Sequence, residues 1–241
     1  MKLLISITNK DEVIEAALGG ADIIDIKNPL EGSLGAPFPR IIKSIEEVAP
    51  ANVQISVAIG DAPDLPGTVS LAALGAVSCN IDYVKLGIYG PASFDSALLL
   101  AREASRAAKE GAPDIRVVIA GYADHRRVGC LETSLIPEIV RRADADVAMV
   151  DTKVKDGTNV FSFLSCEQLQ KFVEEAHANG LSTAIAGSLG IGDIKRLCEL
   201  GADIAGFRGA ACAGDRVKGQ VKRDKVLKIK DQMKAISPAK L

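Results

Sequence analysis

The chain has 241 residues and carries 29 Lys and Arg against 31 Asp and Glu, a formal net charge of −2. A surface of that charge has no basic field to attract nucleic acid or an anionic membrane, so neither is an expected partner. Hydrophobic residues make up 48% of the chain and aromatic residues only 4%. A large core must therefore be built from Ile, Val, Leu and Ala, which is typical of parallel strands covered by helices on both faces.

The cysteines and the apolar segments indicate where the protein works. Five cysteines are spread along the chain without a close pair, and such an odd set is typical of reduced thiols in a cytosol. The first residues, MKLLISI, pass directly into polar residues and are too short for a signal peptide. Since no apolar run approaches the roughly 20 residues that cross a bilayer, we expect a cytoplasmic protein.

Short β-branched runs alternate with longer segments of helical periodicity along the whole chain. In chain order, strands are predicted at residues 3–7, 22–27, 53–59, 83–86, 116–121, 147–151, 182–186 and 204–207. Helical spacing is clear at residues 12–18, 93–110, 166–179, 191–200 and, after the eighth strand, 224–236. Eight strand–helix pairs in a chain close to the roughly 250 residues of one barrel predict an α/β fold, a single (β/α)₈ TIM barrel over residues 1–241.

The turns between these elements support the barrel. The tripeptide Gly-Ala-Asp joins a helix to a strand at residues 20–22 and again at 201–203, where glycine can end the helix in a left-handed conformation. The alternative is a doubly wound open sheet, which often has a glycine-rich turn after its first strand. Here the first strand is followed by residues 8–11 (TNKD), without glycine, so the barrel is favoured.

The second predicted strand directs two charges to one side. Asp25 and Lys27 alternate with Ile24 and Ile26, so both charged side chains share one face of the strand. The active sites of barrels lie at the C-terminal ends of the strands, which is where these residues fall. A structural ion pair between Asp25 and Lys27 is the alternative, but charged groups are rarely buried as mere packing.

Further charged residues mark two other strand ends. Lys85 lies near the end of the fourth strand among apolar neighbours, and Asp151 ends the sixth strand. Lys153 and Lys155 follow in the next loop; either alone is readily explained as a solvated side chain, but above a buried Asp151 one of them is expected in the site. Lysines that converge in a covered site lower one another's pKa, so that one neutral amine can attack a carbonyl. This is the chemistry of a class I aldolase, with the aspartates carrying protons or holding a lysine.

The last two strands predict an anion site. Gly187 and Ser188 follow the seventh strand, and Arg208 and Gly209 follow the eighth. Glycine turns at helix starts expose backbone N–H groups to an anion, and a phosphate site at this place recurs among barrels. Arg208 is expected to add a charge-assisted contact, and simple tight turns are the alternative.

The loop at residues 28–39 is long and contains two glycines and three prolines, so we expect a shaped loop over the mouth, either a lid or a substrate contact. No metal site and no cofactor is predicted. His125 and His177 are the only histidines, and the cysteines lack a plausible base.

Four segments resemble the (5-formylfuran-3-yl)methyl phosphate synthase family: residues 25–36 (DIKNPLEGSLGA), 83–87 (YVKLG), 151–157 (DTKVKDG) and 186–189 (AGSL). The resemblance extends over nearly the whole chain. It implies a lyase of methanofuran biosynthesis that condenses two glyceraldehyde 3-phosphate molecules into a phosphorylated furan aldehyde, with loss of phosphate and water.

The resemblance also implies roles for individual residues. Lys27 would form the Schiff base and Lys85 would accept a proton, while Asp25, Asp151 and Lys155 match other polar positions of the family's site. The aldolase analogy alone would place the imine at Lys153 or Lys155, so we follow the resemblance, because Lys27 has the more buried predicted setting.

The expected partner is a phosphorylated triose, bound as a small-molecule substrate, and a homo-oligomer is compatible with the sequence. Two alternatives stay open at this point. One is a Schiff-base aldolase or isomerase acting on another sugar phosphate, and the other is a non-catalytic sugar-phosphate sensor.

Overall fold

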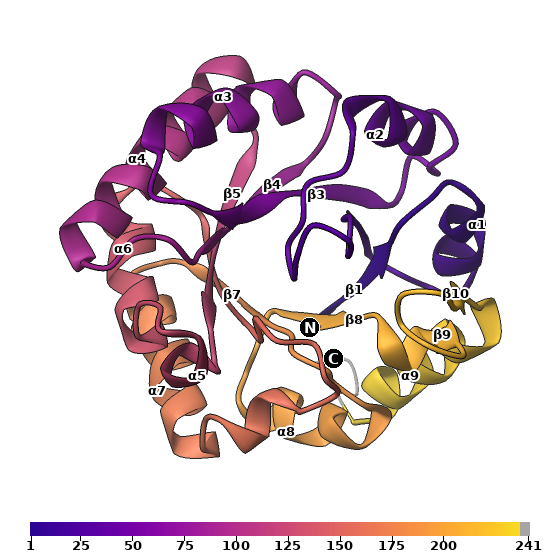
Figure 1. The fold of residues 1–241 in the computed structure, drawn as a ribbon. Helices are drawn as coiled ribbons and strands as arrows, with labels where there is room; N and C mark the ends of the chain where they lie inside the picture. Colours follow the sequence, from indigo (N-terminus) through magenta and orange to yellow (C-terminus); the bar gives the residue numbers. More distant parts are fainter. Residues whose placement is uncertain (237–241) are drawn as a thin grey trace.

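The computed structural model describes residues 1–236, in which eight parallel strands close into a barrel inside a ring of helices (Figure 1). The closing pair is β1 with β8, where Lys2 lies opposite Ile204 and Ile5 opposite Phe207. The predicted TIM barrel is confirmed, and every predicted strand lies within three residues of the observed one. The strands are β1 (Lys2–Ile7), β2 (Ile23–Ile26), β3 (Gln54–Ala62), β4 (Tyr83–Ile88), β5 (Arg116–Tyr122), β6 (Val147–Asp151), β7 (Ser182–Ile185) and β8 (Ile204–Phe207).

The helices cover the outside of the barrel, and none of those described is long and apolar enough to cross a membrane. The helix expected over 191–200 begins as a 3₁₀ turn, η3 (Ile191–Asp193), before α8. Residues 237–241 of the expected domain lie outside the described residues. The helices are α1 (Asp11–Leu18), α2 (Pro39–Glu46), α3 (Pro66–Val77), α4 (Phe94–Gly111), α5 (His125–Val128), α6 (Ile136–Arg142), α7 (Cys166–Ala178), α8 (Ile194–Glu199) and α9 (Arg223–Ile236).

Short elements complete the connections. Three further 3₁₀ turns are η1 (Thr133–Leu135), η2 (Val160–Ser162) and η4 (Gly209–Ala211). After η4, the strands β9 (Cys212–Ala213) and β10 (Gln220–Val221) form an antiparallel hairpin. This hairpin lies beside α1 and α9 at the edge of the barrel mouth (Figure 1).

Strand alternation divides the core into two layers. On β2, Ile24 and Ile26 pack against the helices, whereas Ile23 faces the barrel interior. The interior layer contains small and medium side chains such as Ala58, Val118 and Met149. Aliphatic side chains fill both layers, which explains how a chain with few aromatic residues builds a large core.

The aspartates that open the even-numbered strands have a common structural role. Asp22, Asp82, Asp146 and Asp203 each accept the backbone N–H of a residue in the strand that comes before them in the barrel. The donors are Leu3, Ile55, Val117 and Thr183, at 2.6 to 2.8 Å. The glycines of the two Gly-Ala-Asp turns have φ values of +92° at residue 20 and +73° at residue 201, so they end their helices in the predicted left-handed conformation.

Candidate active site

The C-terminal ends of the strands surround a cavity of about 520 Å³. The inward positions of β1, β2 and β6 form its floor, and the loops after β6, β7 and β8 form its walls. Lys85 is the one predicted site residue that does not line the cavity, although it forms an ion pair with Asp25, which does. Those that line it are Asp25, Lys27, Asp151, Lys155, Gly187, Ser188, Arg208 and Gly209.

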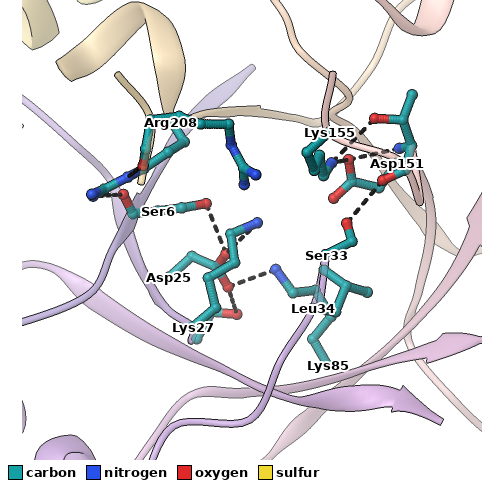
Figure 2. Close-up of polar contacts among 12 residues, drawn as sticks. Ser6, Asp25, Lys27, Ser33, Leu34, Lys85, Asp151, Lys155 and Arg208 are labelled. Atoms are coloured by element: carbon teal, nitrogen blue, oxygen red, sulfur yellow. Dashed lines mark hydrogen bonds and ion pairs between the residues drawn. The ribbon is translucent and has the colours of Figure 1, made fainter. Parts of the chain in front are cut away.

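Asp25 is the centre of a buried charge cluster (Figure 2). Lys85 Nζ lies 2.6 Å from its Oδ1, and Lys27 Nζ lies 3.8 Å from its Oδ2. The hydroxyls of Ser6 and Ser56 also donate to the carboxylate, at 3.0 and 2.9 Å. Burial acts to raise the pKa of Asp25, but Lys85 and Lys27 together hold it below its usual value. Asp25 is therefore an anion that orients two amines.

Ser6 and Ser56 were not among the predicted site residues. Each lies on the inward face of its strand, directly beside Asp25 in the sheet register. The alternation that singled out Asp25 and Lys27 could have identified both serines, because each is a polar residue at an inward position of a strand.

Lys27 carries the amine best suited to attack a carbonyl. Burial, and after it the charge of Lys85, lowers the pKa of Lys27 to about 8, against the opposing effect of Asp25. At that pKa a fraction on the order of a tenth of the amine is neutral at pH 7, compared with well under a thousandth for an ordinary lysine. The side chain of Lys27 is 8% exposed, against 20% for Lys153 and 12% for Lys155. Lys27 is therefore the most buried of the three lysines, as expected from the sequence.

A second ion pair faces the Asp25 cluster across the cavity (Figure 2). Oδ1 of the fully buried Asp151 accepts from Lys155 Nζ and from the backbone N–H of Thr152. Burial acts to raise the pKa of Asp151, but Lys155 and Lys27 keep it below its usual value. The other oxygen, Oδ2, has no hydrogen-bond partner among the described residues. A buried anionic oxygen without a partner is costly, so Oδ2 is an acceptor suited to a ligand proton.

Lys153 belongs to a different cluster, below the loop between β2 and α2. Its Nζ lies 3.3 Å from Asp61 Oδ2 and 4.5 Å from the centre of the Tyr89 ring. The hydroxyl of the buried Tyr122 donates to the other carboxylate oxygen of Asp61. Asp61 was missed in the sequence because β3 changes register between Ala58 and Asp61, so simple alternation does not assign its direction.

The loop between β2 and α2 crosses the barrel mouth, as expected for a loop that covers the site. The backbone N–H groups of Ser33 and Leu34 both donate to Asp61, and Ser33 Oγ donates to the carbonyl of Thr152 on the far side at 2.8 Å. Leu34 is fully buried in the barrel interior. A Cβ on Gly87 would collide with Tyr122 and Leu34, so only glycine fits below this loop.

The turns after β7 and β8 form the opposite wall of the cavity. Gly187 and Ser188 have φ values of +110° and +53°, a conformation that a non-glycine residue such as Ser188 rarely adopts. At Gly209 the position of a Cβ would meet open space, so the backbone is accessible to a ligand. The binding of an anion by these turns stays a prediction.

Arg208 lines the cavity as predicted, but most of its guanidinium is already bound. Its Nη1 donates to Glu12 Oε2 at 2.7 Å and to the carbonyl of Ser6 at 3.0 Å. Nε and Nη2 donate to the carbonyls of Arg216 and Gly219 in the β9–β10 hairpin, at 2.9 and 3.2 Å. Four of the five N–H groups of an arginine are therefore used inside the protein. The contact of Arg208 with phosphate stays a prediction. Its observed partners, at residues 6, 12, 216 and 219, show that it connects the N-terminal and C-terminal parts of the chain.

Among residues 1–236, no group of three or more His, Cys, Asp or Glu side chains is arranged to hold a metal ion. An amine of lowered pKa lies beside two buried carboxylates at the end of the barrel where (β/α)₈-barrel enzymes have their active sites.

The chain belongs to the 4-HFC-P synthase family, whose model matches residues 3–230. A (5-formylfuran-3-yl)methyl phosphate synthase of Methanopyrus kandleri is 49% identical over 233 residues, covering 96% of this chain and 98% of the relative. A protein of the same name from Methanocaldococcus jannaschii is 49% identical over 235 residues, covering 97% of this chain and all of the relative.

Solved structures support the fold independently. Phosphoribosyl anthranilate isomerase from Thermus thermophilus matches with a TM-score of 0.66 at 16% identity, covering 98% of this chain and 100% of that structure. A 3-hexulose-6-phosphate synthase matches with a TM-score of 0.64 at 18% identity, covering 95% and 99% of the two chains. At such low identity these similarities establish the barrel and nothing about its reaction.

Proposed function

We propose that this protein is a (5-formylfuran-3-yl)methyl phosphate synthase of methanofuran biosynthesis, which condenses two molecules of glyceraldehyde 3-phosphate through a Schiff base on Lys27. The relatives that are about half identical over almost the whole chain support the reaction. The observation that carries the mechanism is the Lys27 amine, buried at the cavity floor with a pKa of about 8. A non-catalytic sensor would have no need for such a group.

The carbon skeleton of the product determines which carbon–carbon bond has to form. The ring carbon that bears the CH₂–phosphate group is bonded to an unsubstituted CH carbon of the ring. That CH carbon belongs to the three-carbon half that ends in the formyl group. The formyl half therefore contributes the carbon that has lost its phosphate, and the other half contributes the central carbonyl of a triose in its ketone form. Two triose phosphates give the furan, one inorganic phosphate and two waters, with no net oxidation or reduction.

Lys27 supplies the activation that this bond requires. Its neutral amine adds to the aldehyde of one triose and forms an iminium with loss of water. The iminium withdraws electrons from the adjacent carbon, whose proton can then be removed, and the electron pair expels phosphate from the next carbon. The second glyceraldehyde 3-phosphate isomerises to its ketone form when the proton of its C2 is removed and a proton is returned at C1, and the enol then attacks that ketone. Ring closure by the primary hydroxyl, loss of two waters and hydrolysis of the imine release the furan.

The two carboxylates have different proposed roles because their surroundings differ. Asp151 Oδ2, which is buried and has no partner within the described residues, is the proposed base for the carbon next to the imine. Lys85 lies 2.6 Å from Asp25, which in turn lies 3.8 Å from Lys27. We assign Lys85 and Asp25 to proton exchange at the Lys27 nitrogen as the imine forms and breaks. Lys155, paired with Asp151, is the proposed cation beside the leaving phosphate.

The backbone turns at Gly187, Ser188 and Gly209 are the proposed site for the phosphate that the product keeps. They lie on one wall of the cavity that also contains Lys27 and Asp151, so a triose held there by its phosphate extends toward the amine. Backbone N–H groups at such turns bind a phosphate dianion without adding another titrating group to the site.

One incubation tests the reaction. Purified protein with glyceraldehyde 3-phosphate alone is expected to release inorganic phosphate and to develop the strong ultraviolet absorbance of a furan aldehyde. Aldol products that keep both phosphates, with no release of inorganic phosphate, would identify an aldolase, and a changed aldose-to-ketose ratio alone would identify an isomerase. Tight binding without turnover would identify a sensor, and each of these three outcomes contradicts the proposal.

A second experiment tests the residue. Borohydride reduction during turnover is expected to attach the triose to the peptide that contains Lys27, and Lys27→Met is expected to abolish the adduct. Lys153→Met, which changes a lysine of the neighbouring cluster, is the matched control and should leave the adduct in place. An adduct on Lys153 or Lys155 would overturn the assignment of Lys27.

A further inference from the structure

Arg216 lies in the β9–β10 hairpin and lines the same cavity as Lys27. Within residues 1–236, its guanidinium has no hydrogen bond and no ion pair, whereas the other cations of the cavity have anionic partners. Lys155 is paired with Asp151, and Arg208 with Glu12. A cavity that takes dianionic substrates thus has one arginine whose five N–H donors are all available.

Arg216 lies close enough to the catalytic groups for their charges to interact. Burial lowers the pKa of Arg216, and the Asp151 carboxylate acts against that shift. Burial also lowers the pKa of Lys155, and the charge of Arg216 lowers it further. Asp215, the neighbouring carboxylate on the cavity wall, is directed to the backbone N–H groups of Val217 and Lys218 at 2.7 and 2.8 Å. Its charge is therefore partly satisfied by the hairpin itself.

The position of Arg216 is set by Arg208 and Glu12. Arg208 donates to the carbonyl of Arg216 itself and to that of Gly219, which fixes the hairpin at residue 216 and three residues after it. Glu12 Oε2 binds Arg208, and its Oε1 accepts the N–H of Val221 at 2.9 Å. Arg208 and Glu12 are almost fully buried, so this contact is protected from solvent.

We propose that Arg216 is a phosphate-binding residue of the active site, and that Arg208 is the positioning residue that holds it over the cavity. This inference rests on the proposed function for the identity of the substrate but not for the presence of a phosphate ligand. A planar guanidinium binds two phosphate oxygens through two parallel N–H donors, a geometry that the ammonium of a lysine lacks. The site thereby holds one phosphate at the Gly187 and Gly209 turns and a second between Arg216 and Lys155, as a reaction of two triose phosphates requires.

The test is the binding of dihydroxyacetone phosphate and of unphosphorylated dihydroxyacetone, measured by calorimetry on the full chain. Arg216→Gln is expected to raise the Kd of the phosphorylated triose about 10- to 100-fold and to leave the unphosphorylated triose unchanged. Arg216→Lys should recover only part of the loss, because it restores the charge without the planar donor pair. Lys218→Gln is the matched control, an exposed cation of the same hairpin that does not line the cavity, and its Kd should equal that of the wild type.

The positioning role has its own readout. Arg208→Gln is expected to raise the Kd of dihydroxyacetone phosphate. The double variant with Arg216→Gln should bind this ligand no worse than Arg216→Gln alone, because both changes remove the same contact between Arg216 and phosphate. Equal binding by wild type and Arg216→Gln would overturn the proposal, even if the Arg208 variant fails to fold. Phosphate-dependent binding without furan formation would refute the proposed function and leave the Arg216 inference standing. A wild type that binds neither triose would overturn both.

Discussion

Lys85 Nζ lies 2.6 Å from Asp25 Oδ1, and each side chain is at least 99% buried, which makes this the most buried ion pair of the active site. The same Asp25 carboxylate is 3.8 Å from Lys27. Lys85 therefore affects Lys27 in two ways, by neutralising the Asp25 anion that stabilises the charge of Lys27 and by direct repulsion.

Replacing Lys85 is expected to change two measurable quantities, the free energy of unfolding and the pKa of Lys27. Lys85→Met leaves a buried carboxylate with a weaker partner, so we expect the free energy of unfolding to fall by about 3–5 kcal/mol. It also removes a charge that lowers the pKa of Lys27. The midpoint of borohydride trapping against pH, near 8 in the wild type, should therefore move to higher pH. An unchanged midpoint would show that Lys85 does not tune the imine lysine.

Lys27 is expected to reduce the stability of the fold at neutral pH. Its pKa is about 8 in the folded protein and 10.5 in an ordinary lysine, so between these values the unfolded chain binds more protons and stability rises with pH. Below pH 8 the full cost of the buried charge is present. Lys27→Met should therefore increase the free energy of unfolding at pH 7 by about 1–3 kcal/mol. Urea denaturation at pH 7 and pH 10 checks this, since the advantage of the variant must shrink at the higher pH.

Asp151→Asn should affect proton transfer more than imine formation. The change keeps the shape of the side chain but removes the unpartnered anionic Oδ2. It also removes a charge that raises the pKa of Lys27, so more of the Lys27 amine is neutral at pH 7. We expect turnover to fall by about 10²- to 10⁴-fold, with trapping at pH 7 as fast as in the wild type or faster. Parallel loss of trapping and turnover would assign Asp151 to imine formation instead.

The hydroxyl of Tyr122 is expected to hold the covering loop in place through Asp61. Tyr122→Phe removes the donor to Asp61 and leaves that buried carboxylate with fewer partners, which should cost about 1–3 kcal/mol of stability. Faster amide exchange should be confined to residues 28–35 and the segments they contact. Tyr89→Phe is the control, because Tyr89 has its ring but no hydroxyl bond in this cluster. Unchanged exchange in the loop would remove Tyr122 from this role.

How far the sequence could predict this molecule depended on the local geometry. Asp25 and Asp151 lie on regular strands and Lys27 directly follows β2, where alternation sets the direction of a side chain, and all three line the cavity as predicted. Asp61 follows an irregular register in β3, so the same argument does not reach it. The covering loop was predicted as such, but its contact with Thr152, 119 residues away, was not.

Arg208 illustrates a different limit. Its place on the cavity wall followed from its position after the eighth strand, and it does line the cavity. Its main partner, Glu12, is 196 residues away in sequence, and no local pattern connects the two. Arg216 was missed because it lies in a short hairpin that carries no periodic signal, so only the folded chain places it at the site.

The aspartates at the starts of β2, β4, β6 and β8 make the structural repeat of this barrel two strands rather than one. A cut after α4 would separate the chain into fragments that each retain two intact repeats. The first fragment would contain Lys27 and Lys85, and the second would contain Asp151 and the turns after β7 and β8. Under the proposed function we expect neither fragment to make a furan by itself, so activity recovered on mixing them would report directly on reassembly of the complete barrel.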